Sequence, residues 1–170
     1  MGVEIERKFL LQGDAWRTLG TPVSMRQGYL SSDKARVVRV RIEGEQAYLT
    51  IKSASVGAVR GEWEYPLPID DARELLERVC QQPLVEKTRR RIDHQGHVWE
   101  VDEFFGANAG LVVAEIELDS EDEAFVKPDW IGEEVTGDAR YYNSSLISRP
   151  FSEWGGLAPQ VPVPLFLRRK

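Results

Sequence analysis

Alternation of charged side chains at the start of the chain is the feature that most limits its fold. Glu4, Glu6 and Lys8 stand at every second position, with Ile5 and Phe9 on the opposite parity. Because successive side chains of a β-strand point to opposite faces, both carboxylates and the lysine would share one face. The carboxylates would lie about 7 Å apart, a spacing suited to sharing divalent cations, with the lysine placed to hold an anion. A solvated strand face has the same pattern, so the rest of the chain must decide between the two interpretations.

Strand-like segments dominate the chain. Eight segments are rich in Val, Ile, Tyr and Trp and mostly alternate: 2–11, 25–31, 35–43, 46–53, 61–68, 85–93, 97–104 and 111–119. Short links that contain glycine, such as 43–45 and 94–97, predict hairpin turns and antiparallel neighbours. Helices are predicted over 69–80 and, more briefly, near 14–19, 121–126 and 138–148. We therefore expect an α+β fold, an eight-stranded antiparallel β-barrel with helices packed outside it.

The charges on these segments are sorted by sign. Acids alternate in four of them, as Glu4 and Glu6, Glu62 and Glu64, Glu100 and Asp102, and Glu115 and Glu117. Bases occupy others, as Arg39 and Arg41, Lys52, and Lys87 with Arg89. A solvated face usually mixes signs and includes Ser, Thr and Gln, whereas here each strand tends to carry one sign. If the sheet closes, its apolar face packs outward against helices and the charges line a polar tunnel.

A tunnel lined in this way needs a ligand, water or internal pairing, because unpaired buried charges are costly. Eight acids and six bases, counted with Lys8, suit a polyanion that carries bound cations. Arginine and lysine bind phosphate oxygens, while Mg²⁺ or Mn²⁺ prefers carboxylate oxygen. Without a His or Cys cluster, zinc and copper are poor candidates. Triphosphate with Mg²⁺ or Mn²⁺ meets all of these requirements.

Composition excludes several other classes of protein. The net charge of −6 argues against general nucleic-acid binding, which needs a basic surface. No apolar run approaches the length of a membrane span, and the N-terminus enters a charged strand rather than a signal peptide, so we expect a cytoplasmic protein. Cys80 is the single cysteine and forms no internal disulfide; its position among Leu75 and Leu76 predicts a buried thiol.

The charged segments resemble the CYTH family, also called triphosphate tunnel metalloenzymes. The matching residues run in order along the chain: 3–9, 26–30, 39–41, 49–52, 62–64, 86–89, 101–102, 115–117, 134–136 and 140–143. The resemblance implies an eight-stranded antiparallel tunnel and metal-dependent hydrolysis of inorganic triphosphate to pyrophosphate and phosphate. It places the tunnel domain at 1–150. Residues 151–170 form a C-terminal extension outside the pattern, which we expect to be partly extended because of its prolines at 159, 162 and 164.

The resulting hypothesis assigns a role to each group of charges. The expected phosphate ligands are Lys8, Arg39, Arg41, Lys52, Lys87 and Arg89. The expected metal ligands are Glu4, Glu6, Glu115, Glu117 and Asp102, with Glu62, Glu64 and Arg140 in supporting positions. Glu4 or Glu6 would orient the attacking water, and Lys8 would assist the leaving group.

Other functions remain open at this point. A cavity that grips only phosphates is also expected of a class IV-type adenylyl cyclase, of a nucleoside or thiamine triphosphatase, and of a non-catalytic polyphosphate or nucleotide binding module. The expected partner is a small-molecule polyphosphate or nucleoside triphosphate, with no nucleic acid and no membrane, and a homodimer is one alternative. His94 and His97 fall in a predicted turn and are expected to be solvated, and Trp130 and Trp154 are expected to pack surface helices.

Overall fold

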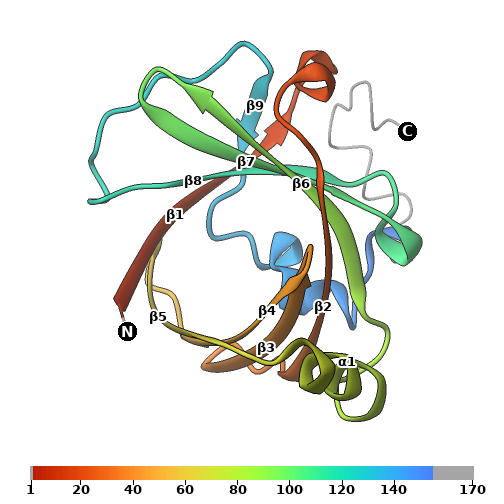
Figure 1. Ribbon diagram of the computed structural model, residues 1–170. Helices are drawn as coiled ribbons and strands as arrows, with labels where there is room; N and C mark the ends of the chain where they lie inside the picture. Colours follow the sequence, from red (N-terminus) through yellow and green to blue (C-terminus); the bar gives the residue numbers. More distant parts are fainter. Residues whose placement is uncertain (1, 155–170) are drawn as a thin grey trace.

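The computed structural model describes residues 2–154, and within them nine strands form one sheet that closes on itself (Figure 1). The strand order is β5-β4-β3-β2-β6-β7-β8-β1-β9, and an additional pairing of β5 with β1 closes the first eight strands into a barrel. All of these neighbours are antiparallel. The strands are β1 (Gly2–Leu11), β2 (Val23–Ser31), β3 (Arg36–Glu43), β4 (Gln46–Ser53), β5 (Val59–Pro66), β6 (Val85–His94), β7 (His97–Phe104), β8 (Val112–Glu117) and β9 (Ile131–Glu134). The expected eight-stranded antiparallel barrel is confirmed.

Strand β1 closes the barrel because its two halves pair with different strands. Its first residues, Gly2 to Ile5, pair with β5, and Glu6 to Leu10 pair with β8. In this register Glu6 lies opposite Glu117, and Lys8 lies opposite Glu115. Residues directly opposite each other on paired strands share a face, so the alternating charges of neighbouring strands point to the same side.

The outer face of the barrel carries much of the hydrophobic core. Helix α1 (Ile69–Arg78) covers β3 and β4, packing Ala72 and Leu76 against Val40 and Ala47. Cys80 belongs to the same buried cluster, as predicted. No helix within residues 2–154 is long and apolar enough to cross a bilayer.

A second outer face is covered by aromatic side chains on irregular backbone. Trp99 of β7 packs edge-to-face with Phe9, Phe125 and Trp130. The helix expected at 121–126 is wrong, because this stretch is a loop, and Trp130 is buried in the core rather than on a surface helix. The loop leads into β9, a strand of four residues that pairs with the end of β1 and was not predicted.

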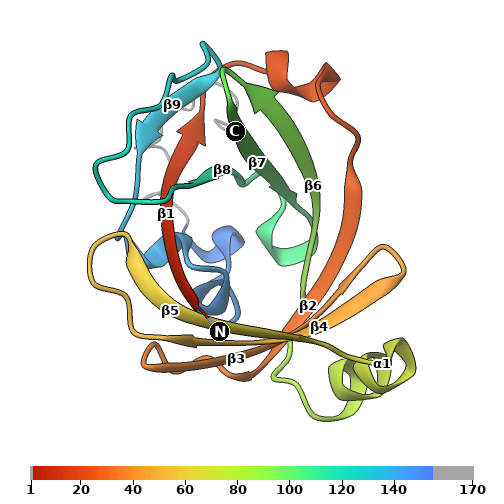
Figure 2. The ribbon, with the colours of Figure 1, turned by 60° about the vertical axis from the view of Figure 1, so that its left-hand side comes forward.

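The inner face changes character along the barrel. The inward-facing rows that carry the charges end in apolar residues, such as Leu10, Val37 and Val113. Two 3₁₀ turns, η3 (Ala139–Tyr141) and η4 (Asn143–Leu146), lie across this end of the barrel in both views (Figures 1 and 2). Tyr141 and Leu146 are buried against the apolar row, so one end of the barrel is sealed by hydrophobic packing.

The remaining short elements are also 3₁₀ turns rather than α-helices. The helices expected near 14–19 and 138–148 are η1 (Ala15–Thr18) and the η3–η4 pair, with η2 (Gly106–Asn108) and η5 (Phe151–Glu153) elsewhere. Trp154 follows η5 and packs edge-to-face on Tyr141, so it seals the barrel end instead of packing a surface helix. The rest of the predicted extension, 155–170, lies outside the described residues.

Candidate active site

The interior of the barrel contains a cavity of about 340 Å³ whose lining is mostly charged. Twelve of the fourteen residues predicted for the site line it: Glu4, Glu6, Lys8, Arg39, Arg41, Lys52, Glu62, Glu64, Lys87, Arg89, Glu115 and Glu117. The alternation explains this result, because each strand has period two and the register aligns the charged rows of its neighbours. The charged face therefore points inward, and the solvated-face interpretation is wrong for this chain.

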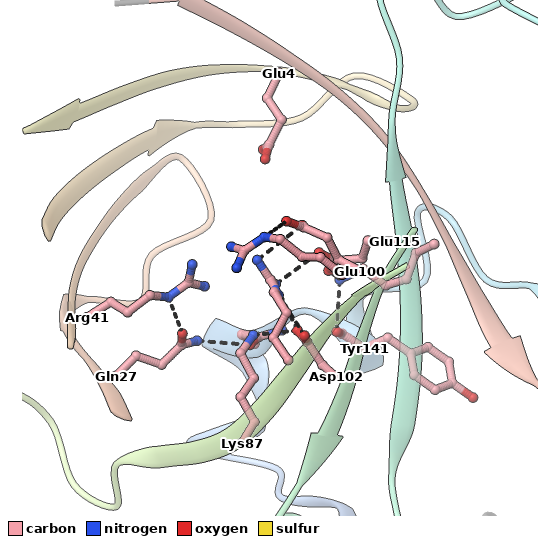
Figure 3. Close-up of polar contacts among 12 residues, drawn as sticks. Glu4, Gln27, Arg41, Lys87, Glu100, Asp102, Glu115 and Tyr141 are labelled. Atoms are coloured by element: carbon pink, nitrogen blue, oxygen red, sulfur yellow. Dashed lines mark hydrogen bonds and ion pairs between the residues drawn. The ribbon is translucent and has the colours of Figure 1, made fainter. Parts of the chain in front are cut away.

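Asp102 lies behind the cavity wall, where it holds two of the cations together. Lys87 Nζ donates to its carboxylate at 2.7 Å, and Arg89 donates through Nε at 2.7 Å and Nη2 at 2.8 Å (Figure 3). Burial raises the pKa of Asp102, but Arg89 and Lys87 outweigh this effect and hold the pKa below its usual value. Asp102 was predicted as a metal ligand; the structure places it as the counterion of Lys87 and Arg89.

Lys87 is a buried cation among other cations. Its pKa is lowered to about 7, because burial, with smaller contributions from the charges of Arg89 and Arg41, outweighs the opposing effect of Asp102. The pKa of Arg41 is also lowered, by burial and by the nearby Arg39 and Arg89. A multiply charged anion would therefore stabilise the charged forms of Lys87 and Arg41, which burial and their cationic neighbours disfavour.

Arg39 has an unpartnered donor in this cluster. Its Nη2 donates to Thr50 Oγ1 at 3.2 Å, but its buried Nε has no hydrogen-bond partner within residues 2–154. Thr50 in turn donates to Glu64 at 2.8 Å. A buried donor without a partner is costly, and a bound phosphate oxygen would satisfy it.

Carboxylates crowd the wall formed by β1 and β8. Lys52 pairs with Glu4 at 3.0 Å, and Lys8 pairs with Glu115 at 3.2 Å while also donating to the backbone carbonyl of Tyr141. The carboxylate of Glu6 makes no hydrogen bond or ion pair among the described residues, although its backbone N–H donates to the carbonyl of Ala58 at 3.0 Å. Burial raises the pKa of Glu6 well above its usual value, and the charges of Glu115 and Glu4 raise it further.

Carboxylate oxygens are the ligands that a hard divalent cation such as Mg²⁺ prefers. Within residues 2–154, no three His, Cys, Asp or Glu side chains are grouped so that they could hold a metal ion on their own. Mg²⁺ does not require such a group, since it is commonly held by one or two carboxylates together with water and substrate phosphates. The crowded Glu6 carboxylate, beside Glu4 and Glu115, fits a site of this kind.

Two predicted residues lie outside the cavity lining, and several lining residues were not predicted. Arg140 pairs with Asp138 at 2.8 Å, and its guanidinium lies over the rings of Tyr141 and Trp154, away from the lining. The other is Asp102, described above. The lining residues that were given no role in the site hypothesis include Glu43, Arg60, Arg91, Glu100, Tyr142 and Asn143, although Glu100 was counted among the tunnel acids.

A signal for some of these residues exists in the sequence. Arg91 continues the alternation of Lys87 and Arg89, and Glu100 precedes Asp102 by two positions. Neither histidine lines this cavity. His94 and His97 lie opposite each other at the β6–β7 turn, and His97 Nε2 lies 2.7 Å from Glu123 Oε2, with the His97 ring packed edge-to-face on Phe125.

Similarity to known proteins agrees with this geometry. Residues 2–150 match the family model described as CYTH domain. A curated relative from Acetivibrio thermocellus, named inorganic triphosphatase, is 51% identical over 154 residues, which cover 91% of this chain and 99% of that protein. A relative of the same name from Nitrosomonas europaea is 38% identical over 147 residues, covering 84% of this chain and 95% of that protein. A solved structure, the inorganic triphosphatase NE1496, is 36% identical with a TM-score of 0.62, covering 86% of this chain and 95% of the other.

Proposed function

The chain belongs to the CYTH domain family, and on this premise we propose that it hydrolyses inorganic triphosphate to pyrophosphate and phosphate inside its barrel, with Mg²⁺ or Mn²⁺ as cofactor. Both curated relatives are named inorganic triphosphatase, and the match spans nearly the whole length of each. The observation that carries the proposal is the interior of the barrel, where a cluster of buried cations faces a crowded group of carboxylates.

The cationic cluster would bind the phosphate oxygens. Arg39, Arg41, Lys87 and Arg89 are buried and belong to adjacent or nearby strands, so their positions are fixed before the substrate arrives. Phosphoryl transfer depends mainly on alignment and on stabilising charge, and fixed cations supply both. Asp102 would act through these cations, by holding Lys87 and Arg89, rather than by binding metal.

The carboxylate group would hold the divalent cations. The proposed metal ligands are Glu4, Glu6, Glu115 and Glu117, with Glu62 and Glu64 in supporting positions on the neighbouring strand β5. When bound, Mg²⁺ or Mn²⁺ supplies neutralisation of phosphate charge and a more acidic water.

Two residues of β1 are proposed to act on the reacting groups. Glu6 would orient the attacking water, since its carboxylate is without a partner among residues 2–154 whereas that of Glu4 is held by Lys52. Lys8, fixed between Glu115 and the carbonyl of Tyr141, would stabilise negative charge on the leaving phosphate.

The cellular location and the partners of the protein are further parts of the proposal. We propose that the protein acts in the cytoplasm on small-molecule triphosphate, without nucleic acid or membrane, and the net charge of −6 supports the first of these exclusions. The boundary of the tunnel domain at 150 and a homodimeric state stay predictions.

A substrate panel tests the proposed function. Purified protein is incubated with tripolyphosphate, ATP and thiamine triphosphate, with Mg²⁺ or Mn²⁺, and the products are resolved by chromatography. We expect pyrophosphate and orthophosphate from tripolyphosphate, little product from Glu6→Gln, and wild-type turnover from Glu45→Gln, an exposed residue in the β3–β4 turn. Cyclic AMP would indicate a cyclase instead, preferred hydrolysis of ATP or thiamine triphosphate would reassign the substrate, and no turnover of any compound would indicate a binding module.

A further inference from the structure

Gln27 is a neutral side chain buried among the cations of the barrel. It lies on β2 directly opposite Arg41 of β3, and none of its surface is exposed. Its Oε1 accepts from Arg41 Nε at 2.8 Å (Figure 3). Its Nε2 donates to Asn143 Oδ1 at 2.9 Å and to Tyr29 Oη at 3.2 Å. A guanidinium can only donate, so the contact with Arg41 fixes the orientation of the amide and turns its NH₂ group toward Asn143.

Asn143 continues this network to a second cation. It is the first residue of η4, in the segment that lies across the sealed end of the barrel. Its Oδ1 accepts from Lys87 Nζ at 2.8 Å as well as from Gln27, and Lys87 is itself bound to Asp102 at 2.7 Å. An unbroken series of hydrogen bonds therefore runs from Asp102 of β7 through Lys87 and two amides to Arg41.

Neutral amides have a physical advantage at these two positions. Arg41 and Lys87 are both buried, and their charges repel each other, so each needs a hydrogen-bond acceptor to hold it. A carboxylate would hold either cation, but it would also cancel positive charge that a polyanion requires. An amide oxygen accepts the hydrogen bond and leaves the charge of the cluster intact.

We propose that Gln27 and Asn143 are positioning residues that fix the spacing of Arg41 and Lys87, and so determine where phosphate oxygens bind at the sealed end of the cavity. The inference rests on the proposed function, because it assumes that these cations bind a triphosphate. Gln27 and Asn143 act through the two cations.

Three variants separate this role from simple stabilisation of the fold. Gln27→Met and Asn143→Leu remove the hydrogen bonds while keeping approximate volume. Gln27→Glu keeps an acceptor for Arg41 but adds negative charge. The matched control is Asn108→Leu, since Asn108 is also a buried amide but accepts from the backbone N–H of Phe151 at 2.8 Å, outside the cavity lining.

Tripolyphosphate binding is measured by titration calorimetry in EDTA, so that no metal-dependent hydrolysis competes, and thermal unfolding is recorded for each protein. We expect Gln27→Met and Asn143→Leu to bind about tenfold more weakly, the factor that corresponds to losing one hydrogen bond to a charged group. Gln27→Glu should remain folded and also bind about tenfold more weakly. Asn108→Leu should unfold at a lower temperature and bind within twofold of wild type.

Each other outcome decides against the inference. Wild-type affinity in all three variants, or equal weakening in Asn108→Leu, would show that the amides only support the fold. Wild-type affinity in Gln27→Glu alone would show that neutrality at this position is irrelevant. If the wild-type protein does not bind tripolyphosphate in EDTA, the inference fails, because the cations then do not hold the anion by themselves; the proposed function is tested separately, by the substrate panel with metal present.

Discussion

Removing the charge of Asp102 should destabilise the free protein strongly and make it depend on the substrate for stability. The carboxylate is 1% exposed and accepts three hydrogen bonds from Lys87 and Arg89, at 2.7, 2.7 and 2.8 Å. Asp102→Asn keeps the shape of the side chain and one acceptor oxygen. It leaves two buried cations without their shared counterion.

The size of the effect follows from this burial. Removing one partner of a buried ion pair costs about 3–5 kcal/mol, since the remaining charge stays desolvated. In a domain of this size each kcal/mol lowers the melting temperature by about 2–4 °C, so the variant should unfold roughly 6–20 °C below wild type. Tripolyphosphate would restore negative charge beside Lys87 and Arg89, and should raise the melting temperature of Asp102→Asn by more than that of wild type.

Thermal unfolding followed by circular dichroism, with and without tripolyphosphate in EDTA, measures both effects. Asp93→Asn is the matched control, because Asp93 is an exposed aspartate on the neighbouring strand β6. A decrease of less than about 2 °C for Asp102→Asn would refute the assignment of Asp102 as the counterion of the cluster. Equal stabilisation of variant and wild type by tripolyphosphate would show that the anion binds elsewhere.

Three further predictions concern the metal, the substrate affinity and the packing of α1. Excess EDTA should abolish hydrolysis and added Mg²⁺ or Mn²⁺ should restore it, whereas full activity in EDTA would exclude a metal cofactor. Lys52→Ala should raise KM about tenfold with a smaller change in kcat, since it removes one charged contact to phosphate, and unchanged steady-state constants would remove Lys52 from the site. Gly28→Ala would place a methyl group 2.7 Å from Leu84 Cδ2 and 2.9 Å from Cys80 Cβ, and should cost about 1–3 kcal/mol in a urea titration. Gly2→Ala, where no atom lies within 4 Å, should unfold like wild type, and equal stability of both variants would contradict the close packing of Gly28 against Cys80 and Leu84, which follow α1 in the same cluster.

The arrangement of the charged rows could be predicted because it depends on local geometry. Period-two alternation fixes which side chains share a face, and the hairpin turns fix which strands are neighbours. Closure of the barrel then places β1 beside β8, where Glu6 and Lys8 meet Glu117 and Glu115 in the cavity, as the charge pattern indicated. The sorting of charge by strand was informative because the charged part of each inward-facing row lines the same cavity.

The features that could not be predicted depend on contacts between distant segments. Asp102 is an exception, since it lies directly opposite Arg89 across the predicted β6–β7 hairpin; what the pattern did not indicate is that it lies behind the cavity wall, between Lys87 and Arg89. Gln27 and Asn143 are neutral, so a search for charge patterns does not detect them, and their contact joins residues 116 positions apart in the sequence. Arg140 lies in η3, just before Asn143, but its ion pair with the nearby Asp138 holds it away from the cavity lining.

Short elements were missed for a different reason. Strand β9 has four residues, too few to show alternation, and it forms only because the end of β1 offers it a partner. The helix expected near 138–148 is instead the pair of 3₁₀ turns η3 and η4, which the packing of Tyr141 and Leu146 into the barrel end holds in place.

Hydrolysis of tripolyphosphate is tested most directly by phosphorus NMR of the reaction as it proceeds. With purified protein and Mg²⁺ or Mn²⁺, the tripolyphosphate resonances should be replaced by those of pyrophosphate and orthophosphate in equal molar amounts, and Glu6→Gln should produce almost none. Tripolyphosphate that persists unchanged in the presence of folded protein and either metal would contradict the proposed activity.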